Sequence, residues 1–308
     1  MINDAHCHFF SPPFFDALGR QRPGGGQSGA DVVSALGWTP PGSADALADR
    51  WVGELDKNGV ARAALIASVP RDEDSVAAAV ARHPSRFVGF FMLDPTEADA
   101  TSRVERALHE LQLAAICLFP AMQRYSLHAA PVKAVIEVAA RHPGTAVFVH
   151  CGALSVGVRK KLGLPSRFDV RFGNPLDLHA LAADHPQVPF IIPHFGAGLL
   201  REALMVADLC PNVYLDTSSS NRWMSYHPGL TLPAVFRHTI NTIGAERLLF
   251  GTDSSFFPRG WHRAVYESQV NALDSAGVDE TVRGQIVAAN FDRLFPSSAK
   301  LNLSRRPA

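Results

Sequence analysis

Two short stretches of the sequence decide the fold: residues 146–150 read AVFVH and residues 190–194 read FIIPH. Each stretch is an apolar run that ends in a histidine. A short apolar run without alternating polar side chains is typical of a parallel strand that is covered on both faces. The residue that follows such a strand lies at its carboxyl end. The two stretches therefore predict a buried parallel sheet with reactive side chains at one edge.

Similar runs recur along the chain, separated by stretches rich in alanine and leucine. We predict strands at residues 2–8, 63–69, 87–93, 114–119, 146–150, 189–194, 213–216 and 248–252. We predict helices at residues 44–57, 74–82, 98–111, 131–141, 175–184, 199–208, 233–242 and 260–275. Eight strand–helix units predict one α/β domain, a (β/α)8 TIM barrel over residues 1–298. A doubly wound open sheet is the alternative.

The longest stretch without a helix or strand pattern is residues 9–43, after the first strand. It contains PGGGQSG at residues 23–29 and TPPG at residues 39–42. In a barrel this stretch leaves the rim that carries active sites, so we expect a long loop insertion. Such a loop is either a lid over the site or a mobile insertion, and we favour the lid. We expect residues 299–308 to form a flexible C-terminal tail.

Composition and charge exclude several classes of function. Hydrophobic residues make up 47% of the 308 residues, and 29 Lys and Arg balance 29 Asp and Glu. Without a basic excess we expect no nucleic-acid partner. No apolar run approaches the roughly 20 residues that span a membrane, and the N-terminus lacks a signal-peptide pattern. Four widely spaced cysteines are typical of reduced thiols, so we expect a cytoplasmic protein.

Histidine or aspartate occupies the carboxyl ends of four predicted strands. His6 and His8 alternate along the first strand and therefore project to the same face. His150, His194 and Asp253 end the fifth, sixth and eighth strands. In one barrel these side chains would converge at one mouth. Imidazoles and a carboxylate bind Zn²⁺ or a similar divalent ion such as Mn²⁺ or Fe²⁺, so the sequence predicts a catalytic metal site.

The sequence also resembles the amidohydrolase superfamily, within it the amidohydrolase-2 group of metal-dependent hydrolases similar to aminocarboxymuconate-semialdehyde decarboxylase. The matching motifs are DAHCHF (4–9), FVH (148–150), HFGAG (194–198), FGTD (250–253) and ANFDRLF (289–295). The resemblance implies metal ligands at His6, His8, His150 and Asp253, and catalytic roles for His194 and Asp253. Residues 116–120 lack the lysine of two-metal members, which implies one metal. The resemblance also implies that the chain can form a homodimer.

The resemblance leaves two reactions open. Hydrolysis of a small amide, lactone or ester by metal-activated water is our leading hypothesis. Asp253 would accept the proton of the water, and His194 would stabilise the oxyanion. The alternative is non-oxidative decarboxylation of an aromatic or unsaturated carboxylic acid. A third hypothesis, a barrel that binds a small ligand without turnover, predicts that no metal is retained on purification.

Side chains expected at the rim predict a small-molecule substrate. Phe119 and Trp223 would suit a flat cyclic or aromatic compound, although aromatic side chains also pack loops onto a rim. Arg222 and Arg259 would hold a substrate carboxylate with two hydrogen bonds, or else are ordinary surface arginines. Ser254, next to the last predicted ligand, is a further candidate contact with the substrate.

Overall fold

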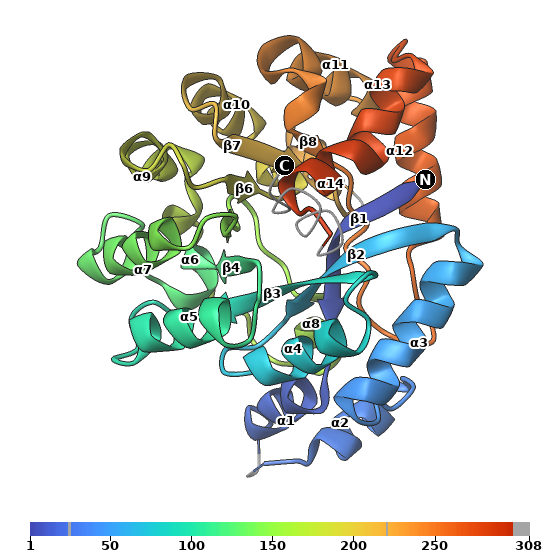
Figure 1. Cartoon of the computed structure of the whole chain (residues 1–308). Coiled ribbons are helices and arrows are strands. Elements are labelled where there is room, and N and C mark those ends of the chain that lie inside the picture. Colours follow the sequence, from blue (N-terminus) through green and yellow to red (C-terminus); the bar gives the residue numbers. More distant parts are fainter. Residues whose placement is uncertain (24–25, 220, 298–308) are drawn as a thin grey trace, which may run out of the picture.

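Eight parallel strands form one sheet in which each strand pairs with the next one along the chain (Figure 1). The computed structural model describes residues 1–23, 26–219 and 221–297. The strands are β1 (Ile2–Phe9), β2 (Val60–Ala67), β3 (Phe87–Leu93), β4 (Ala115–Leu118), β5 (Ala146–Val149), β6 (Phe190–Ile192), β7 (Val213–Asp216) and β8 (Leu248–Leu249). All eight predicted strands are therefore present.

The sheet closes on itself through the backbone that follows β8. The amide nitrogen of Ala5 lies 2.8 Å from the carbonyl oxygen of Phe250, and the amide nitrogen of Asp253 lies 2.9 Å from that of His6. A parallel bridge also joins Cys7 to Ser254. The predicted (β/α)8 barrel is confirmed. The open-sheet alternative is wrong, because the two outer strands of an open sheet do not meet.

Helices surround the barrel and alternate with its strands (Figure 1). The main ones are α3 (Ala44–Lys57), α4 (Glu73–Arg82), α5 (Ala100–His109), α7 (Ala130–Arg141), α9 (His179–Asp184), α10 (Leu200–Leu209), α11 (Leu232–Ile243) and α12 (Arg263–Ser275). Shorter ones are α6 (Pro120–Gln123), α8 (Gly157–Lys161), α13 (Glu280–Gly284) and α14 (Asn290–Leu294). Each predicted helix is present, but the one predicted at 175–184 begins with a separate 3-10 turn, Pro175–Leu178.

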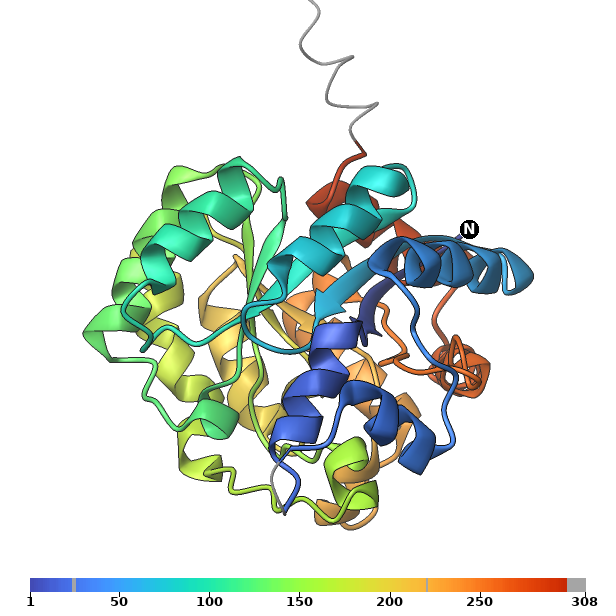
Figure 2. The ribbon, with the colours of Figure 1, turned by 90° about the horizontal axis from the view of Figure 1, so that it is seen from below.

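The insertion after β1 is helical, which corrects the prediction of a long loop. It contains α1 (Pro12–Arg20) and α2 (Gly29–Leu36). Ser28 and Asp31 form a reciprocal capping box that starts α2. The two helices bury apolar side chains against α8, which gives the insertion a small core of its own. Figure 2 shows α1, α2 and α8 together at one end of the barrel, opposite α14.

Alternation along the strands separates two apolar layers. On β3, Phe90 and Met92 face the barrel interior, whereas Phe91 and Leu93 face the surrounding helices. Cys7 on β1 also faces the helices, because it lies between two inward-facing histidines. Strands covered on both faces in this way explain why their sequences are continuously apolar.

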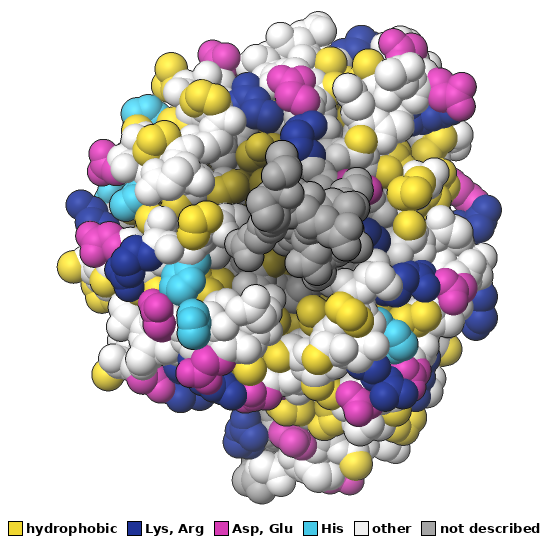
Figure 3. All heavy atoms as spheres, viewed as in Figure 1, with side chains coloured by type: hydrophobic (Ala, Val, Ile, Leu, Met, Phe, Trp, Pro, Cys, Tyr) yellow, Lys and Arg dark blue, Asp and Glu magenta, His cyan; other side chains and the backbone are white. Residues whose placement is uncertain are grey.

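Ion pairs join neighbouring helices on the outside of the molecule. Arg82 of α4 pairs with Asp49 of α3 (Nε to Oδ1, 2.6 Å), and Arg106 of α5 pairs with Asp74 of α4 (Nη2 to Oδ1, 2.6 Å). Figure 3 shows positive and negative side chains interspersed on one face. Exposed pairs of this kind are screened by water and contribute little to stability, so the fold depends mainly on its apolar layers.

Within residues 1–23, 26–219 and 221–297, no helix has the length and apolar character needed to cross a membrane. The tail predicted at residues 299–308, together with residue 298 of the predicted domain, lies outside the described residues.

Candidate metal centre

A bulge in β1 brings His6 and His8 into the barrel. Asp4 pairs with Ala63 of β2 and Cys7 pairs with Leu65, so three steps along β1 match two steps along β2. The side chain of Asp4 supports the bulge by accepting a hydrogen bond from the amide of His6 (2.9 Å). The extra residue shifts the alternation so that His6 and His8 face inward while Cys7 faces outward.

Three of the predicted ligands come together at the mouth of the barrel. The Nε2 atoms of His6 and His8 lie 3.4 Å apart, and the Oδ1 atom of Asp253 lies 3.2 Å from that of His8 and 3.8 Å from that of His6. All three donor atoms fall within 4.8 Å of one another. Two imidazoles and a carboxylate at this spacing form a donor set that suits one divalent cation.

His150, the fourth predicted ligand, lies beside His194 and outside the close group formed by His6, His8 and Asp253. Its ring stacks on Phe119, with 5.5 Å between the centroids, and the centroid of His194 is 5.3 Å away. It belongs to neither group of donor atoms that falls within 4.8 Å. Its buried Nδ1 has no hydrogen-bond partner among the described residues, which costs about 1–3 kcal/mol in the absence of a ligand. Such a nitrogen fits a role in binding a cation.

The backbone is strained where the chain presents two of the reactive side chains. His194 has a φ of 57° and Asp253 has a φ of 59°, and neither residue is glycine. The left-handed region disfavours residues with a Cβ atom, and such strain tends to occur at functional sites. Here the unusual backbone turns both side chains toward the mouth at the points where β6 and β8 have ended.

Burial controls the protonation of these side chains. Burial is the largest effect on His8, His150 and His194, and it lowers the pKa of each. Burial is also the largest single effect on His6, but the carboxylates of Asp216, Asp253 and Asp4 together outweigh it and raise the pKa of that ring. Burial opposes ionisation of Asp253 as well. The hydrogen bond with His8 and the charges of the two β1 histidines nevertheless hold the pKa of that carboxyl well below its usual range.

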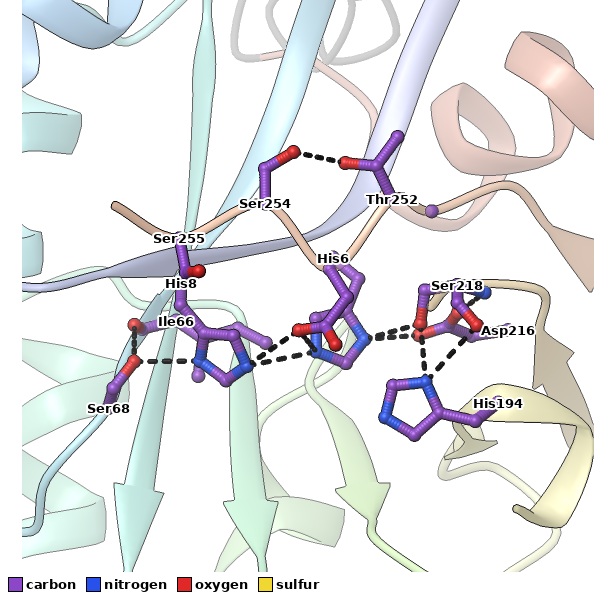
Figure 4. Close-up of polar contacts among 12 residues, drawn as sticks. His6, His8, Ile66, Ser68, His194, Asp216, Ser218, Thr252, Ser254 and Ser255 are labelled. Atoms are coloured by element: carbon purple, nitrogen blue, oxygen red, sulfur yellow. Dashed lines mark hydrogen bonds and ion pairs between the residues drawn. The ribbon is translucent and has the colours of Figure 1, made fainter. Parts of the chain in front are cut away.

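Polar residues from β2 and β7 hold the β1 histidines, and we did not predict them from the sequence. Ser68, just after β2, contacts Nδ1 of His8 through its hydroxyl (2.8 Å). Asp216, the last residue of β7, contacts Nδ1 of His6 (2.6 Å). Figure 4 shows these side chains converging on the two rings. The signal for Asp216 was present in the sequence, because residues 213–216 read VYLD, an apolar strand ending in a carboxylate.

Two of the predicted substrate contacts lie at the site. Phe119 packs against His150 as described above. The guanidinium group of Arg259 donates to the carbonyl oxygen of Asp253 (3.2 Å) and to the hydroxyl of Ser255 (2.8 Å), and it lies over the ring of Phe256. Arg259 is thus held beside the carboxylate while part of its side chain remains exposed.

The structure does not bring the other predicted contacts to the site. Ser254 is fully buried, and its hydroxyl contacts that of Thr252 (2.5 Å) and points away from the histidines (Figure 4). The same hydroxyl also accepts a hydrogen bond from the amide of His262 (2.8 Å), so Ser254 is held away from the site where Asp253 turns in. Trp223 packs in the layer between sheet and helices, and Arg222 beside it is exposed. We therefore do not assign Ser254 or Trp223 to the substrate site.

Aromatic side chains of the insertion cover the site on the side of His8. The ring of Phe10 lies 5.7 Å from that of His8 and stacks on Phe14 at 3.9 Å. Trp38, which follows α2, stacks on Phe256 at 4.0 Å. These contacts join the insertion to the loop after β8. The insertion therefore forms one wall of the site, as expected for a lid, and its movement stays a prediction.

A family model and one curated protein match this chain. The family model described as Amidohydrolase, of the amidohydrolase-2 group, matches residues 3–296 of the chain. Among curated proteins, Protein fluG of Emericella nidulans is 31% identical over 140 residues, which are 44% of this chain and 16% of that protein. The match therefore covers less than half of this chain and a small part of that much longer relative.

Solved structures share the barrel. One is 5-carboxyvanillate decarboxylase LigW2 of Novosphingobium aromaticivorans with bound manganese, at a TM-score of 0.63 and 13% identity over 96% of this chain and 97% of that chain. Another is a probable 2-pyrone-4,6-dicarboxylic acid hydrolase of Acinetobacter baumannii, at a TM-score of 0.62 and 13% identity over 96% and 98% of the two chains. At this identity the likeness shows the fold.

Proposed function

This chain belongs to the amidohydrolase family, and from that premise we propose that it is a hydrolase that depends on one divalent metal ion, Zn²⁺ in the first place, with Mn²⁺ or Fe²⁺ as alternatives. The substrate class we propose is a small carboxylated cyclic or aromatic amide, lactone or ester. One observation carries this proposal: Nε2 of His6, Nε2 of His8 and Oδ1 of Asp253 converge within 4.8 Å at the barrel mouth.

The proposed ligands are His6, His8, His150 and Asp253. A divalent ion bound there would lower the pKa of a water molecule to about 7 and polarise a substrate carbonyl. Asp253 is suited to take up the proton of the attacking water, because it is held ionised and its side chain is 34% exposed, against 1% for His6. It therefore faces the space that a substrate would enter.

His194 is the second proposed catalytic group. Its ring centroid lies 5.0 Å from that of His6 and 5.3 Å from that of His150, so it borders the cluster without belonging to the group around Asp253. From this position the imidazole can donate a hydrogen bond to a developing oxyanion. A preorganised donor of this kind typically contributes about 3–4 kcal/mol to transition-state stabilisation.

Arg259 and Phe119 support the proposed substrate class. A guanidinium group beside the reacting carboxylate can bind an anionic substituent, and a phenyl ring can pack on a flat ring system. The names of the two solved relatives both refer to carboxylated ring compounds, a pyrone dicarboxylic acid and a carboxyvanillate. Their substrates differ, but both combine an anionic substituent with a planar ring.

Decarboxylation is the second candidate function, favoured by the LigW2 decarboxylase, whose barrel matches 96% of this chain. In that reaction the ring carbon bearing the carboxylate takes up a proton, and the bond to the carboxylate breaks so that CO₂ leaves. His194 or Asp253 would deliver the proton. The same residues would thus support either reaction, and the substrate decides between them.

The test combines metal analysis with a turnover screen. We expect the purified chain to retain about one divalent ion per molecule and to turn over carboxylated lactones or amides. In water enriched in ¹⁸O, hydrolysis places the label in the ring-opened acid, whereas decarboxylation of hydroxybenzoates releases CO₂ without such labelling. Asp253→Asn is the matched control, because it keeps the shape of the side chain. A wild-type chain that binds its ligands without metal or turnover would refute both candidates.

A further inference from the structure

Asp216 and Ser218, at the end of β7, connect two histidines that come from different strands. Oδ2 of Asp216 lies 2.6 Å from Nδ1 of His6. The hydroxyl of Ser218 lies 2.9 Å from the same nitrogen and 2.8 Å from Nδ1 of His194. Figure 4 shows this hydroxyl between the two rings. Both β7 side chains are fully buried, so neither can touch a substrate.

The distance between Asp216 and His6 distinguishes a hydrogen bond from a second metal site. Donor atoms of His6, His194 and Asp216 also fall within 4.8 Å of one another, as ligands of an ion would. Two ligands of a tetrahedral zinc ion, each about 2.1 Å from it, lie about 3.4 Å apart. The observed 2.6 Å is too short for that arrangement and suits a charge-assisted hydrogen bond.

This hydrogen bond fixes the proton of His6. A carboxylate only accepts, so Nδ1 of His6 must donate to Asp216 and carry the proton. Nε2, which faces His8 and Asp253, is then the nitrogen left to bind a metal ion. The other carboxylate oxygen of Asp216 accepts a hydrogen bond from the amide of Ser218, so the carboxylate is held at both ends.

The backbone at Gly251 packs closely against His6, Ser218 and Asp216. Gly251, just beyond β8, faces this group of side chains. A Cβ atom at Gly251 would lie 2.9 Å from the Cβ atom of His6 and 2.9 Å from that of Ser218. Only glycine leaves room for the two side chains to approach each other here. The arrangement of His6, Asp216 and Ser218 is therefore determined by packing as well as by hydrogen bonds.

We propose that Asp216 and Ser218 are positioning residues: Asp216 holds the proton of His6 on Nδ1 so that Nε2 binds the metal, and Ser218 holds His6 and His194 at a fixed separation. This inference rests on the proposed metal-dependent function. It assigns no metal ion to the group formed by His6, His194 and Asp216.

The first test measures metal binding in Asp216→Asn by competition with a chromophoric chelator. We expect one zinc ion per chain in the wild type and in the variant, with affinity lowered about 10–100-fold, since loss of such a partner weakens a metal site by this amount. Asp72→Asn is the matched control. Asp72 is also a buried carboxylate, but it accepts hydrogen bonds from Ser11 and Ser75 at the start of α4. The Asp72→Asn variant should bind zinc with the same affinity as the wild type.

The second test concerns Ser218→Ala. We expect zinc affinity within about threefold of the wild type, altered ¹⁵N imidazole signals of His194, and a kcat lowered about tenfold at unchanged KM, as for the loss of one hydrogen bond. Thr217→Val is the matched control. The hydroxyl of Thr217 is equally buried, but it bonds Gln269 of α12 (2.6 Å) and not a histidine. The Thr217→Val variant should show the ¹⁵N imidazole signals of His194 and the kcat of the wild type.

The outcomes separate this inference from the proposed function. A wild-type chain that binds no divalent ion refutes the proposed function and this inference with it. A wild-type chain that binds one ion, with equal affinity in Asp216→Asn, overturns the inference alone. Two ions in the wild type and one in the variant would make Asp216 a ligand instead. Unchanged ¹⁵N signals and kcat in Ser218→Ala would remove Ser218 from the assignment.

Discussion

The two ends of the barrel interior differ in polarity: the amino end is apolar and the carboxyl end is polar. At the amino end, Phe90 and Phe295 pack ring against ring at 5.2 Å, and Phe291 adds a third ring beside them. At the carboxyl end the interior holds imidazoles, carboxylates and hydroxyls. Phe148 of β5 marks the boundary, because its ring lies 5.2 Å from that of His6 while its own layer is apolar.

Stability and chemistry therefore depend on different ends of the same barrel. Hydrocarbon at the amino end is stabilised by burial alone and needs no particular partner. Each polar side chain at the carboxyl end depends on a specific partner, because an unpaired buried polar atom is destabilising. Substitutions at the amino end should therefore lower stability with little effect on turnover, and substitutions at the carboxyl end should do the reverse.

Asp253→Asn should give the largest effect, and it should lower turnover at the carboxyl end without lowering stability. The substitution removes a negative ligand and the proposed proton acceptor, so we expect kcat/KM to fall by about 10⁴-fold or more. The melting temperature should stay close to that of the wild type, because the side chain keeps its shape. Steady-state kinetics, metal analysis and calorimetry measure the three quantities. Wild-type metal content together with wild-type turnover would exclude Asp253 from the site.

Phe291→Ala should lower stability at the amino end without lowering turnover. Phe291 is 1% exposed, packs against Phe295 and lies beneath the guanidinium group of Arg62. Removing the ring should lower the free energy of unfolding by about 3–5 kcal/mol. The folded fraction should keep the kcat of the wild type at low temperature. Denaturant titration measures the first quantity, and a fall in kcat without loss of stability would contradict the division between the two ends.

His194→Ala distinguishes metal binding from catalysis at the carboxyl end. If His194 acts on the substrate and is not a ligand, the variant should bind one metal ion as the wild type does. Its kcat should fall about 10²–10³-fold, the usual effect of removing one oxyanion donor. Metal analysis and kinetics on the same preparation separate the two roles. Loss of the metal would make His194 a ligand, and an unchanged kcat would end its catalytic role.

Much of the barrel could be predicted because burial on both faces leaves a continuous apolar pattern. β3 and β7 have the predicted bounds, and so does α3. β8 is shorter than predicted, only Leu248–Leu249, because the residues after it bond to β1 through isolated contacts and not as a regular ladder. The helices of the insertion escaped prediction because its glycine and proline residues obscured the capping signal at Ser28.

The site could be predicted where histidines alternate along a strand, as His6 and His8 do, and where a reactive residue ends an apolar run. The second pattern selects His150 and Asp253, and the strand that ends in Asp216 obeys it equally. It could not give the orientation of residues beyond a strand end, where the backbone no longer alternates regularly. Ser254 and Trp223 lie in such segments, and their side chains turn away from the mouth for reasons that depend on tertiary packing.

Arg259→Ala should give the smallest effect and define where the carboxyl end meets the substrate. Arg259 is held by the carbonyl of Asp253 and the hydroxyl of Ser255, outside the buried cluster. Loss of one charged hydrogen bond to a carboxylated substrate should raise KM about tenfold and leave kcat nearly unchanged. Arg263→Ala is the control, because Arg263 pairs with Glu267 along the exposed face of α12. Equal KM values in both variants would place the substrate carboxylate elsewhere on the rim.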